Sequence, residues 1–481
     1  MLEHNNNMLE RGQHIRKGLE VIFKLLFLIT GFMFFSNITF AKPILSLFMW
    51  SSIFVGGIVI LWRLLLIKEF IKSKYLWLLI IFAISHMISS LLNISYGYYE
   101  NFKLLIWMAF QFGILYAYDK TRTKEDMVRE FHFISHIFII SVFILSFISF
   151  QYIFGNKKSY FTFLETGYLM RYGFSWGRLF GAYLDPNYAA VFAVISCVLS
   201  IYYCIRWKKW WTYLLYGLNI VLQLGYITFS DSRTGKLSLC VSFGFMTYML
   251  AIFYFKKKFN SSKKYIVGII TTGIVVVLLT LIPVGIKSGY NVYIAAKEAQ
   301  QEEKDPVDED VEVPEDEEDK NQSQEIGREQ DIEGDISNRR FDLWKSGVEI
   351  FKTKPIFGVS FKNILSYVEK EIPSSYLITN DHGKFDNMHN VIFNIIPAQG
   401  VVGIVIFIAI ALAYALFIFK NLKVVDSTDY IWIIVLLTCI GTAVCSMMFV
   451  TDVIYAITPS SFLFWLFLGY IVQYIEAKKT S

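Results

Sequence analysis

The sequence predicts an all-α, polytopic membrane protein with about twelve transmembrane helices and a large extracytoplasmic loop that contains an amphipathic helix. Of its 481 residues, 55% are hydrophobic, 17% aromatic and only 18% charged, whereas about a quarter of the residues of a soluble domain are charged. The mean hydropathy is +0.47. Apolar runs of about 18 residues or more, which can cross a hydrocarbon core about 30 Å thick, recur along most of the chain. These properties exclude an ordinary soluble globular protein.

The apolar runs divide the chain into three helical segments separated by two long loops. The runs lie at 19–41, 43–67, 75–93, 102–118, 131–154, 187–205, 210–230, 235–255, 265–286, 390–419, 430–451 and 455–475. We therefore expect transmembrane helices 1–5 within residues 1–154, a first extracytoplasmic loop at 155–186, helices 6–9 within 187–286, a large extracytoplasmic loop at 287–389, and helices 10–12 within 390–481.

Basic residues set the expected orientation of these spans. Lys and Arg collect in alternate short loops, at 11–17, 68–74, 120–129, 206–209, 256–264, 420–423 and 478–479. Because cytoplasmic loops carry the excess of positive residues, that side and both termini are predicted to be cytoplasmic. The first span could instead be a cleaved signal peptide, since Thr39-Phe40-Ala41 resembles a cleavage site. Its long apolar run and the span that follows at once favour retention.

An acidic insert interrupts the large outer loop. Residues 298–335 contain eighteen Asp and Glu against three Lys and Arg, with two prolines and no aromatic residue. Such a segment cannot bury enough apolar surface to offset its ordering entropy, and we expect it to be disordered. A calcium site is the alternative, but the loop pattern that would frame one is missing. A third reading is that the insert shields a nearby basic site.

One candidate cation lies at the tip of a helical hairpin. The segment FSDSRTGK, residues 229–236, joins the seventh and eighth spans by a very short turn. Arg233 is thereby held at the membrane boundary on the side opposite the basic loops. An interface anchor is the plainer interpretation, but a cation in this position favours a functional role.

A second candidate cation precedes the sixth span. In YGFSWGRLFGAYLDPNYAA, residues 172–190, Arg178 comes shortly before the turn Asp185-Pro186-Asn187. Asp185 or Asn187 can cap the first turn of the helix that follows.

A third outward segment, residues 337–363, reads SNRRFDLWKSGVEIFKTKPIFGVSFKN. Helical spacing predicts an amphipathic surface helix with an apolar side formed by Phe341, Trp344, Val348 and Phe351. Arg339 and Arg340 occupy its first turn, where the helix dipole disfavours a cation by about 0.3–1 kcal/mol. Arg340 borders the apolar side and Arg339 points away, so Arg340 is the better candidate. It could also simply reach toward lipid phosphates.

The segment DNMHNVIFNIIPAQGVVG, residues 386–403, places His389 and Asn390 at the mouth of an apolar run. A helix through this run would align His389, Phe393, Ile396, Gly400 and Gly403 on one face. Histidine has an unperturbed pKa of about 6.5 and is the usual proton acceptor near neutral pH. The residues alone leave two roles open for His389, a hydrogen-bonded structural histidine and a general base.

These four segments, in this order and topology, resemble the Wzy-type O-antigen polymerase and O-antigen ligase family of bacterial envelope glycosyltransferases. GRLFGAYLDPNYAA, SDSRTGK, an Arg-x-x-x-Trp helix start followed by KPIFGVSF, and MHNVIFNIIPAQGVVG carry the resemblance over about residues 175–410. The chain departs from the family in having Ser360 where a glycine is frequent, and in its acidic insert. The first five spans carry almost no motif.

The resemblance implies a metal-independent, inverting glycosyl transfer on the outer face of the bacterial cytoplasmic membrane, with no cofactor. Donor and acceptor would be undecaprenyl-diphosphate-linked oligosaccharides. Guanidinium groups can neutralise a diphosphate leaving group, and an imidazole can accept the proton of a sugar hydroxyl. The implied catalytic residues are His389, Arg233 and Arg340, and the implied substrate-binding residues are Arg178, Asn187, Arg339 and Asn390. We expect Arg178, Arg233, Arg340 and His389 to share one outward pocket beneath the surface helix.

Polymerisation of surface polysaccharide is the leading hypothesis, and a ligase that transfers the glycan to lipid A core or protein is the alternative. Abundant Lys, Asn, Ile and Phe hint at an AT-rich, single-membrane host, which favours the polymerase. Twelve spans would also suit a transporter, but the halves share no motif and the spans show no ionisable residue at mid-depth. Membrane lipid is an expected partner and nucleic acid is not. A flippase and a chain-length regulator are left open as partners.

Overall fold

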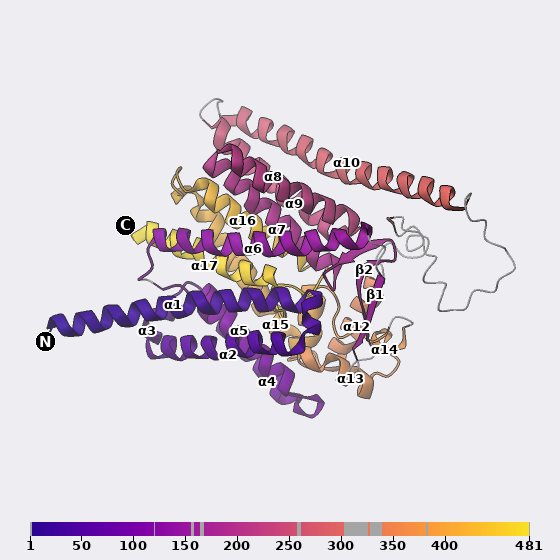
Figure 1. The fold of residues 1–481 in the computed structure, drawn as a ribbon. Coiled ribbons are helices and arrows are strands. Elements are labelled where there is room, and N and C mark those ends of the chain that lie inside the picture. The colour runs from indigo at the N-terminus through magenta and orange to yellow at the C-terminus, as the bar shows by residue number, and fades with distance from the viewer. Residues whose placement is uncertain are drawn as a thin grey trace. The chain divides into compact units, whose positions relative to one another are not determined.

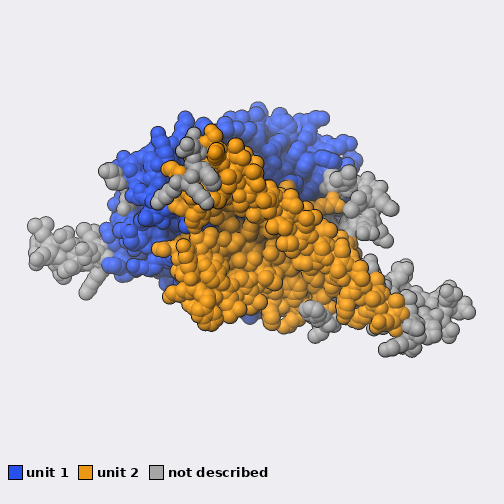
Figure 2. Space-filling model, turned by 90° about the horizontal axis from the view of Figure 1, so that it is seen from above, with its two compact units in different colours: residues 1–138, 339–481 blue, residues 139–338 orange. Residues whose placement is uncertain are grey.

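The computed structural model describes residues 2–119, 121–154, 158–163, 168–256, 261–302, 326–327, 339–380 and 383–480. The chain forms two compact units, which Figure 2 shows in different colours. Unit 1 comprises residues 1–138 and 339–481, and unit 2 comprises residues 139–338. Unit 1 is therefore assembled from both ends of the chain, and unit 2 from its middle.

The helices of unit 1 are drawn in indigo, purple, orange and yellow in Figure 1. In its first stretch they are α1 (Leu2–Phe34), η1 (Asn37–Phe40), α2 (Lys42–Leu65), α3 (Ile67–Phe70), α4 (Leu76–Leu92), η2 (Ile94–Tyr96), α5 (Tyr99–Phe110), the π-helical η3 (Gln111–Tyr116) and the start of α6 (Lys124–Phe154). In its second stretch they are α12 (Arg340–Thr353), η4 (Phe361–Asn363), α13 (Ile364–Glu371), α14 (Tyr376–Thr379), α15 (Val391–Asn421), η5 (Leu422–Val424), α16 (Tyr430–Ser446) and α17 (Pro459–Thr480). α17 packs against α16, α1 and η3, and α15 packs against α4 and α12.

Unit 2 contains the rest of α6, three strands and four helices in its described part. The strands are β1 (Lys158–Phe163), β2 (Tyr168–Ser175) and β3 (Arg178–Gly181), and the helices are α7 (Pro186–Trp207), α8 (Trp210–Phe229), α9 (Arg233–Phe255) and α10 (Ser261–Glu302). α7 packs against α8 and α9, while α10 packs against α9. The apolar α10 lies at the edge of this helix group in Figure 1.

The described residues include eight helices that are long and apolar enough to cross a membrane: α2, α6, α7, α8, α9, α10, α15 and α17. Two shorter apolar helices, α4 and α16, coincide with two further predicted spans. The remaining predicted spans, 19–41 and 102–118, correspond to α1 and to α5 continued by η3. The chain is a helical, multi-pass membrane protein, and the number of about twelve spans stays a prediction.

The predominantly helical fold agrees with the all-α prediction, and the first outer loop adds a small antiparallel sheet in the order β1-β2-β3. Ser175 pairs with Arg178 across a two-residue turn. Both turn residues, Trp176 and Gly177, have positive φ angles of 53° and 62°, as the favoured hairpin turns require. The strands are short and rich in aromatic residues, which suit a pleated surface. Because Arg178 is the first residue of β3, its pairing with Ser175 in the sheet fixes the position of its backbone.

The acidic insert begins inside a helix. α10 continues past the predicted membrane boundary at 286 as far as Glu302, so the first residues of the insert are helical. Most of the remaining insert lies outside the described residues. Its two described residues, Ile326 and Gly327, are held by hydrogen bonds within unit 2: Asn291 both donates to and accepts from the Ile326 backbone at 2.8 Å, and the Gly327 amide donates to the Gly177 carbonyl at 3.1 Å.

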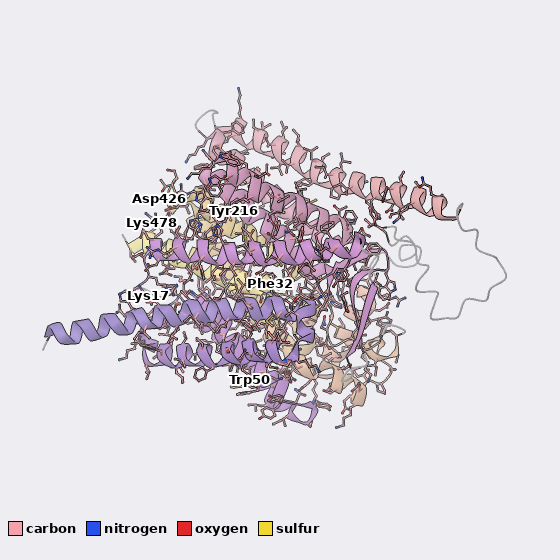
Figure 3. The ribbon with its side chains drawn as sticks, in the orientation of Figure 1. Lys17, Phe32, Trp50, Tyr216, Asp426 and Lys478 are labelled. Atoms are coloured by element: carbon pink, nitrogen blue, oxygen red, sulfur yellow. The ribbon has the colours of Figure 1, made fainter. Side chains whose placement is uncertain are left out.

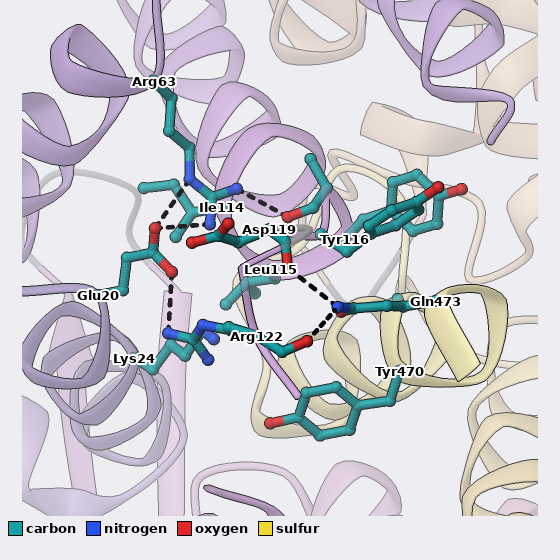
Figure 4. Close-up of a pocket in the computed structure, with 13 residues that line it drawn as sticks. Glu20, Lys24, Arg63, Ile114, Leu115, Tyr116, Asp119, Arg122, Tyr470 and Gln473 are labelled. Atoms are coloured by element: carbon teal, nitrogen blue, oxygen red, sulfur yellow. Dashed lines mark hydrogen bonds and ion pairs between the residues drawn. The ribbon is translucent and has the colours of Figure 1, made fainter. Parts of the chain in front are cut away.

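A network of buried ion pairs ties the predicted cytoplasmic end of unit 1 together (Figure 4). Glu20 pairs with Arg63 at 2.8 Å and with Arg122 at 2.9 Å. Lys24 pairs with Glu130 at 2.5 Å, and Glu130 also pairs with Arg122. The network borders a cavity of about 20 Å³, enough for a water molecule.

Two more pairs lie at the same end of unit 1. Arg16 and Asp119 form a further buried pair, and the more exposed Lys478 pairs with Asp426 at 2.5 Å. Figure 3 labels Lys17, Asp426 and Lys478 at this end of the ribbon. Ion pairs thus connect the predicted cytoplasmic loops of unit 1 with one another and with the last helix, while the side of the membrane on which they lie stays a prediction.

The network bears on one premise of the sequence analysis, that the spans hold no ionisable residue at mid-depth. Glu20, Lys24 and Arg63 are buried inside helices. They lie near the predicted cytoplasmic ends of the spans 19–41 and 43–67 rather than at the centres of these spans. A buried charge in a membrane helix is stable only when it is paired, and here each of the three has a partner.

Candidate functional site

Unit 2 brings Arg178 and Asn187 into direct contact. Arg178 is buried at the start of β3 and donates from Nε to the Ser230 carbonyl at 2.8 Å, and from Nη2 to Asn187 Oδ1 at 3.0 Å. Asp185, not Asn187, caps α7, because its side chain accepts from the amides of residues 187 and 188. The Asn187 side chain is therefore available to orient Arg178.

The polar hairpin predicted around Arg233 is confirmed. α8 ends at Phe229 and α9 begins at Arg233, which is exposed. Ser232 caps α9 by accepting from the Gly235 amide at 3.0 Å, and its hydroxyl donates to Asn187 Oδ1 at 2.9 Å. One amide oxygen, that of Asn187, thus connects Arg178 to the hairpin that carries Arg233.

Close packing of α9 on α7 supports this arrangement. A Cβ atom added at Gly235 would lie 2.4 Å from the Ala190 Cβ, a distance that real Cβ atoms do not show. The glycine two residues after Arg233 therefore lets the start of α9 approach α7. The SDSRTGK motif combines a capping serine, a cation and a close-contact glycine.

In unit 1 the predicted surface helix is present as α12, and the face that it packs against the protein is not the predicted apolar side. Phe341 is 64% exposed. The buried residues are Leu343, Ser346, Gly347 and Ile350. The face is displaced because α12 lies close to α15: a Cβ at Gly347 would be 3.1 Å from the Phe393 carbonyl oxygen. Small residues on this face allow the two helices to approach closely. The helical spacing of large apolar residues, on which the prediction was based, does not reveal such a face.

The two arginines at the start of α12 differ in position. Arg339 precedes the helix with a left-handed backbone (φ 64°) and is exposed. Arg340 is the first helical residue and is half-buried, with its guanidinium carbon 5.5 Å from the centroid of the Phe449 ring. This distance suits a cation–π contact. The preference for Arg340 over Arg339 as the more enclosed group agrees with the structure.

His389 lies on a tight turn before α15 and is not part of the helix. Its φ angle is 50°, and its side chain is half-buried. Asn390 caps α15, accepting from the Ile392 amide at 2.9 Å, and its own amide donates to the Met448 carbonyl at 2.9 Å. Both ends of the Asn390 side chain therefore bond backbone groups around the turn. If Asn390 contributes to substrate binding, it does so by positioning His389.

The expectation of one helix face running from His389 to Gly403 is wrong, because α15 is interrupted at Gly400 (φ 62°, ψ −156°). The KPIFGVSF segment pairs with the break. Val359 donates to the Pro397 carbonyl at 2.8 Å, and Val401 donates to the Pro355 carbonyl at 2.8 Å. A broken membrane helix needs such partners for the backbone groups that it exposes.

Contacts between aromatic rings and backbone join α12 to the His389 turn. Trp344 stacks on Phe393 with ring centroids 4.7 Å apart and an interplanar angle of 3°. Its indole nitrogen donates to the Met388 carbonyl at 3.1 Å. These contacts connect α12, which begins with Arg340, to the turn that carries His389, and we call this group the unit 1 cluster. Arg178, Asn187 and the Arg233 hairpin form the corresponding cluster in unit 2. That all four charged residues share a single pocket stays a prediction.

The sequence analysis missed one element of the unit 1 cluster, the α16–α17 loop at residues 447–458. It contacts both Arg340 and the His389 turn. A signal was present in the polar pair Thr451-Asp452 between two apolar spans on the predicted outer side. Those residues were counted as the margin of a span because the flanking runs are strongly apolar.

Residues 218–408 match a family model described as O-antigen ligase. The matched range contains the Arg233 hairpin, α12 and the His389 turn, while the Arg178 segment precedes it. No curated protein matches the chain. The match confirms the resemblance drawn from the motifs and implies, in general terms, a membrane enzyme that transfers glycosyl groups. The match over residues 218–408 thus supports the O-antigen ligase and polymerase family for this part of the chain.

Proposed function

We propose that the protein polymerises undecaprenyl-diphosphate-linked oligosaccharide repeat units into a surface polysaccharide on the outer face of the bacterial cytoplasmic membrane. The family match carries this proposal, and the two clusters support it: Arg178 is hydrogen-bonded to Asn187 in unit 2, and Arg340 faces the Phe449 ring in unit 1. The polymerase is preferred over the ligase on the composition of the chain, which favours a single-membrane host.

In the proposed reaction, a hydroxyl oxygen of the acceptor sugar attacks the anomeric carbon of the donor. The bond from that carbon to the diphosphate oxygen breaks, the configuration inverts, and undecaprenyl diphosphate leaves. His389 accepts the hydroxyl proton as general base. The leaving group carries the bonding electron pair as negative charge, which a cation must stabilise.

Arg178 and Arg233 are proposed to stabilise the diphosphate. A guanidinium presents a planar fork of donors that matches phosphate oxygens. Arg178 is pre-oriented by hydrogen bonds to the Ser230 carbonyl and to Asn187, and a donor fixed before the reaction costs no reorganisation when charge develops. Arg340 is proposed to add a further positive charge, and Arg339 to bind the substrate from the exposed start of α12.

A second candidate function is favoured by the description of the matched family, which is O-antigen ligase. In that case the same chemistry would deliver the glycan to lipid A core or to a protein. The two activities differ only in the acceptor, and the acceptor that is consumed distinguishes them.

The test is a reconstituted reaction. Purified protein in lipid vesicles receives undecaprenyl-diphosphate oligosaccharide, and chain length and released undecaprenyl diphosphate are measured with and without a lipid A core acceptor. Longer lipid-linked chains support the polymerase. Glycan transfer only when lipid A core or protein is supplied supports the ligase. Movement of intact donor across the bilayer without release of diphosphate would instead indicate a transporter.

A further inference from the structure

We propose that the α16–α17 loop, residues 447–458, is a positioning element for the catalytic groups of unit 1, and that Thr451 is its positioning residue. This inference rests on the proposed roles of His389 and Arg340. The loop lies outside the matched range 218–408, and neither motif nor spacing assigns it a role. The claim concerns placement of the groups, and Thr451 is not proposed to touch the substrate.

The Thr451 hydroxyl lies between two asparagines that hold the His389 turn. It donates to Asn387 Oδ1 at 2.8 Å and accepts from Asn394 Nδ2 at 3.0 Å. Asn387 Oδ1 in turn accepts from the His389 amide at 3.0 Å, and Asn394 Oδ1 accepts from the Met388 amide at 2.7 Å. One hydroxyl therefore fixes the two carboxamides that bind consecutive backbone amides of the turn.

This bracing matters because His389 has a left-handed backbone. A non-glycine residue in that region is strained by about 1–3 kcal/mol and persists only when its surroundings over-determine the conformation. The amides of residues 388 and 389 donate to the side-chain oxygens of Asn394 and Asn387, and these hydrogen bonds supply that constraint.

The first three residues of the loop contact the C-terminal end of the turn, at residues 390 and 391, and the side chain of Arg340. The Met447 carbonyl accepts from the Val391 amide at 2.8 Å, and the Met448 carbonyl accepts from Asn390 at 2.9 Å. Phe449 supplies the ring that faces the Arg340 guanidinium. A short stretch of one loop thus contacts the supports of both proposed catalytic groups.

The loop is itself anchored by a buried carboxylate. Asp452 is 1% exposed and accepts from the hydroxyls of Ser446 and Ser460 at 2.7 Å each and from the Val453 amide at 2.8 Å. The Thr458 hydroxyl also donates to it. A buried charge is tolerated when it is hydrogen-bonded in this way, and the bonds close the loop from α16 to α17. The residue next to Thr451 therefore locks the loop from which Thr451 projects.

The decisive experiment uses Thr451→Val, which removes the hydroxyl with little change of shape, and Thr451→Ser, which restores it. A displacement of about 1 Å at a reacting group can cost on the order of 100-fold in rate. In the reconstituted polymerisation reaction we expect Thr451→Val to lower kcat by about 10- to 100-fold with KM nearly unchanged, and Thr451→Ser to recover most of the rate. Wild-type kcat in Thr451→Val overturns the proposal.

Thr438→Val is the matched control. Thr438 is buried like Thr451, but its hydroxyl donates to the Ile434 carbonyl of its own helix at 2.7 Å. We expect this variant to keep kcat. An equal loss of kcat in both variants would show a general effect of losing a buried hydroxyl and would overturn the positioning role.

A second readout does not depend on the reaction. Hydrogen exchange of the peptide covering residues 386–393 should be at least about 10-fold faster in Thr451→Val than in wild type, and unchanged in Thr438→Val. Absence of this difference rejects the coupling between the loop and the turn even if activity falls. If the wild-type protein extends no lipid-linked glycan while the exchange difference is present, the coupling stands and the proposed function fails.

Discussion

Single polar side chains determine how the cations of this protein are presented. Asn187 is the clearest case, because its one carboxamide oxygen accepts from both Arg178 and Ser232. Each interaction alone is an ordinary hydrogen bond, worth about 1 kcal/mol net. Together they place one buried cation beside the hairpin that begins α9. The chemistry proposed for Arg178 and Arg233 therefore depends on a neutral residue as much as on the charges.

Replacing Arg233 with lysine tests whether the hairpin cation is functional. Lysine keeps the charge but loses the planar fork that matches phosphate oxygens. We expect Arg233→Lys to lower the rate of chain extension by on the order of 100-fold, which is the usual cost of losing one pre-organised donor. The measurement is release of undecaprenyl diphosphate by purified protein in vesicles.

Arg206→Lys is the control for that substitution, because Arg206 lies in the last turn of α7 at the predicted cytoplasmic side. It should retain the wild-type rate. Wild-type turnover in Arg233→Lys would identify Arg233 as a membrane-interface anchor and remove it from the mechanism.

Among the elements, the broken helix α15 is the one on which the unit 1 cluster depends most. A Cβ at Gly400 would lie 2.4 Å from the Ile356 carbonyl oxygen, and one at Gly358 would lie 2.4 Å from the Pro397 carbonyl oxygen. Both glycines also have positive φ angles. The two segments can therefore pair only as backbone against backbone, which locks the loop after α12 to the interior of α15.

Gly400→Ala should destabilise the protein strongly, because the new methyl group meets backbone atoms and the φ angle of 62° disfavours alanine. We expect a loss of about 3 kcal/mol or more, typical of overpacking combined with backbone strain. Thermal unfolding of the detergent-solubilised protein measures it. Gly441→Ala in α16 has open space around the added atom and should leave the unfolding temperature within a few degrees of wild type. Equal stability of the two variants would contradict this view of the break.

How much of this arrangement could be predicted depended on the range of the interactions. The SDSRTGK hairpin and the start of α12 are local, and their capping serine, glycine and helical spacing are visible in the sequence. The packed face of α12 was not predicted, because it includes the small residues Ser346 and Gly347. The Gly400 break was visible as an irregularity in the apolar run. Its pairing with Pro355 to Val359, however, joins segments about forty residues apart and requires the fold.

The buried ion pairs escaped prediction for the same reason. Glu20, Arg63 and Glu130 come from three different helices, and each residue on its own is typical of a span end. The network becomes visible only from the distances between these side chains in the folded structure. The sheet of the first outer loop was missed because β1 and β2 are short and lie within a generally aromatic chain, so their composition does not stand out.

Taken as a whole, unit 1 depends on its ion pairs to hold the N-terminal helix, the loop after η3 and the C-terminal helix together. Asp119 in that loop pairs with Arg16 of α1, and its backbone carbonyl accepts from Gln473 of α17 at 2.9 Å. Burial alone would raise the pKa of Asp119. Hydrogen bonds from Thr121 and the charges of Arg16 and Arg122 outweigh burial and hold the pKa below its usual value.

A lowered pKa in the folded state means that ionised Asp119 stabilises the fold above the ordinary carboxyl pKa of about 4, and that this contribution is lost as the pH falls through the lower folded value. Asp119→Asn should therefore lose about 3 kcal/mol at neutral pH, the usual cost of breaking a buried pair. Its unfolding temperature should also fall less than that of wild type between about pH 5 and pH 3.

The exposed pair Glu369–Lys384 provides the control for Asp119→Asn. Glu369→Gln should cost less than about 1 kcal/mol at any pH, as exposed pairs do. If Asp119→Asn unfolds at the wild-type temperature at pH 7, the ion pairs do not hold the ends of unit 1 together.

The proposed activity depends above all on a single imidazole on the turn before α15. The most direct test is the reconstituted reaction with undecaprenyl-diphosphate oligosaccharide, comparing wild type with His389→Ala and monitoring both chain length and released undecaprenyl diphosphate. Wild type is predicted to extend the glycan and release the lipid diphosphate, and His389→Ala to do neither while its unfolding temperature and membrane insertion stay unchanged. Near-normal chain extension by a folded His389→Ala protein would contradict the general-base role and the mechanism built on it.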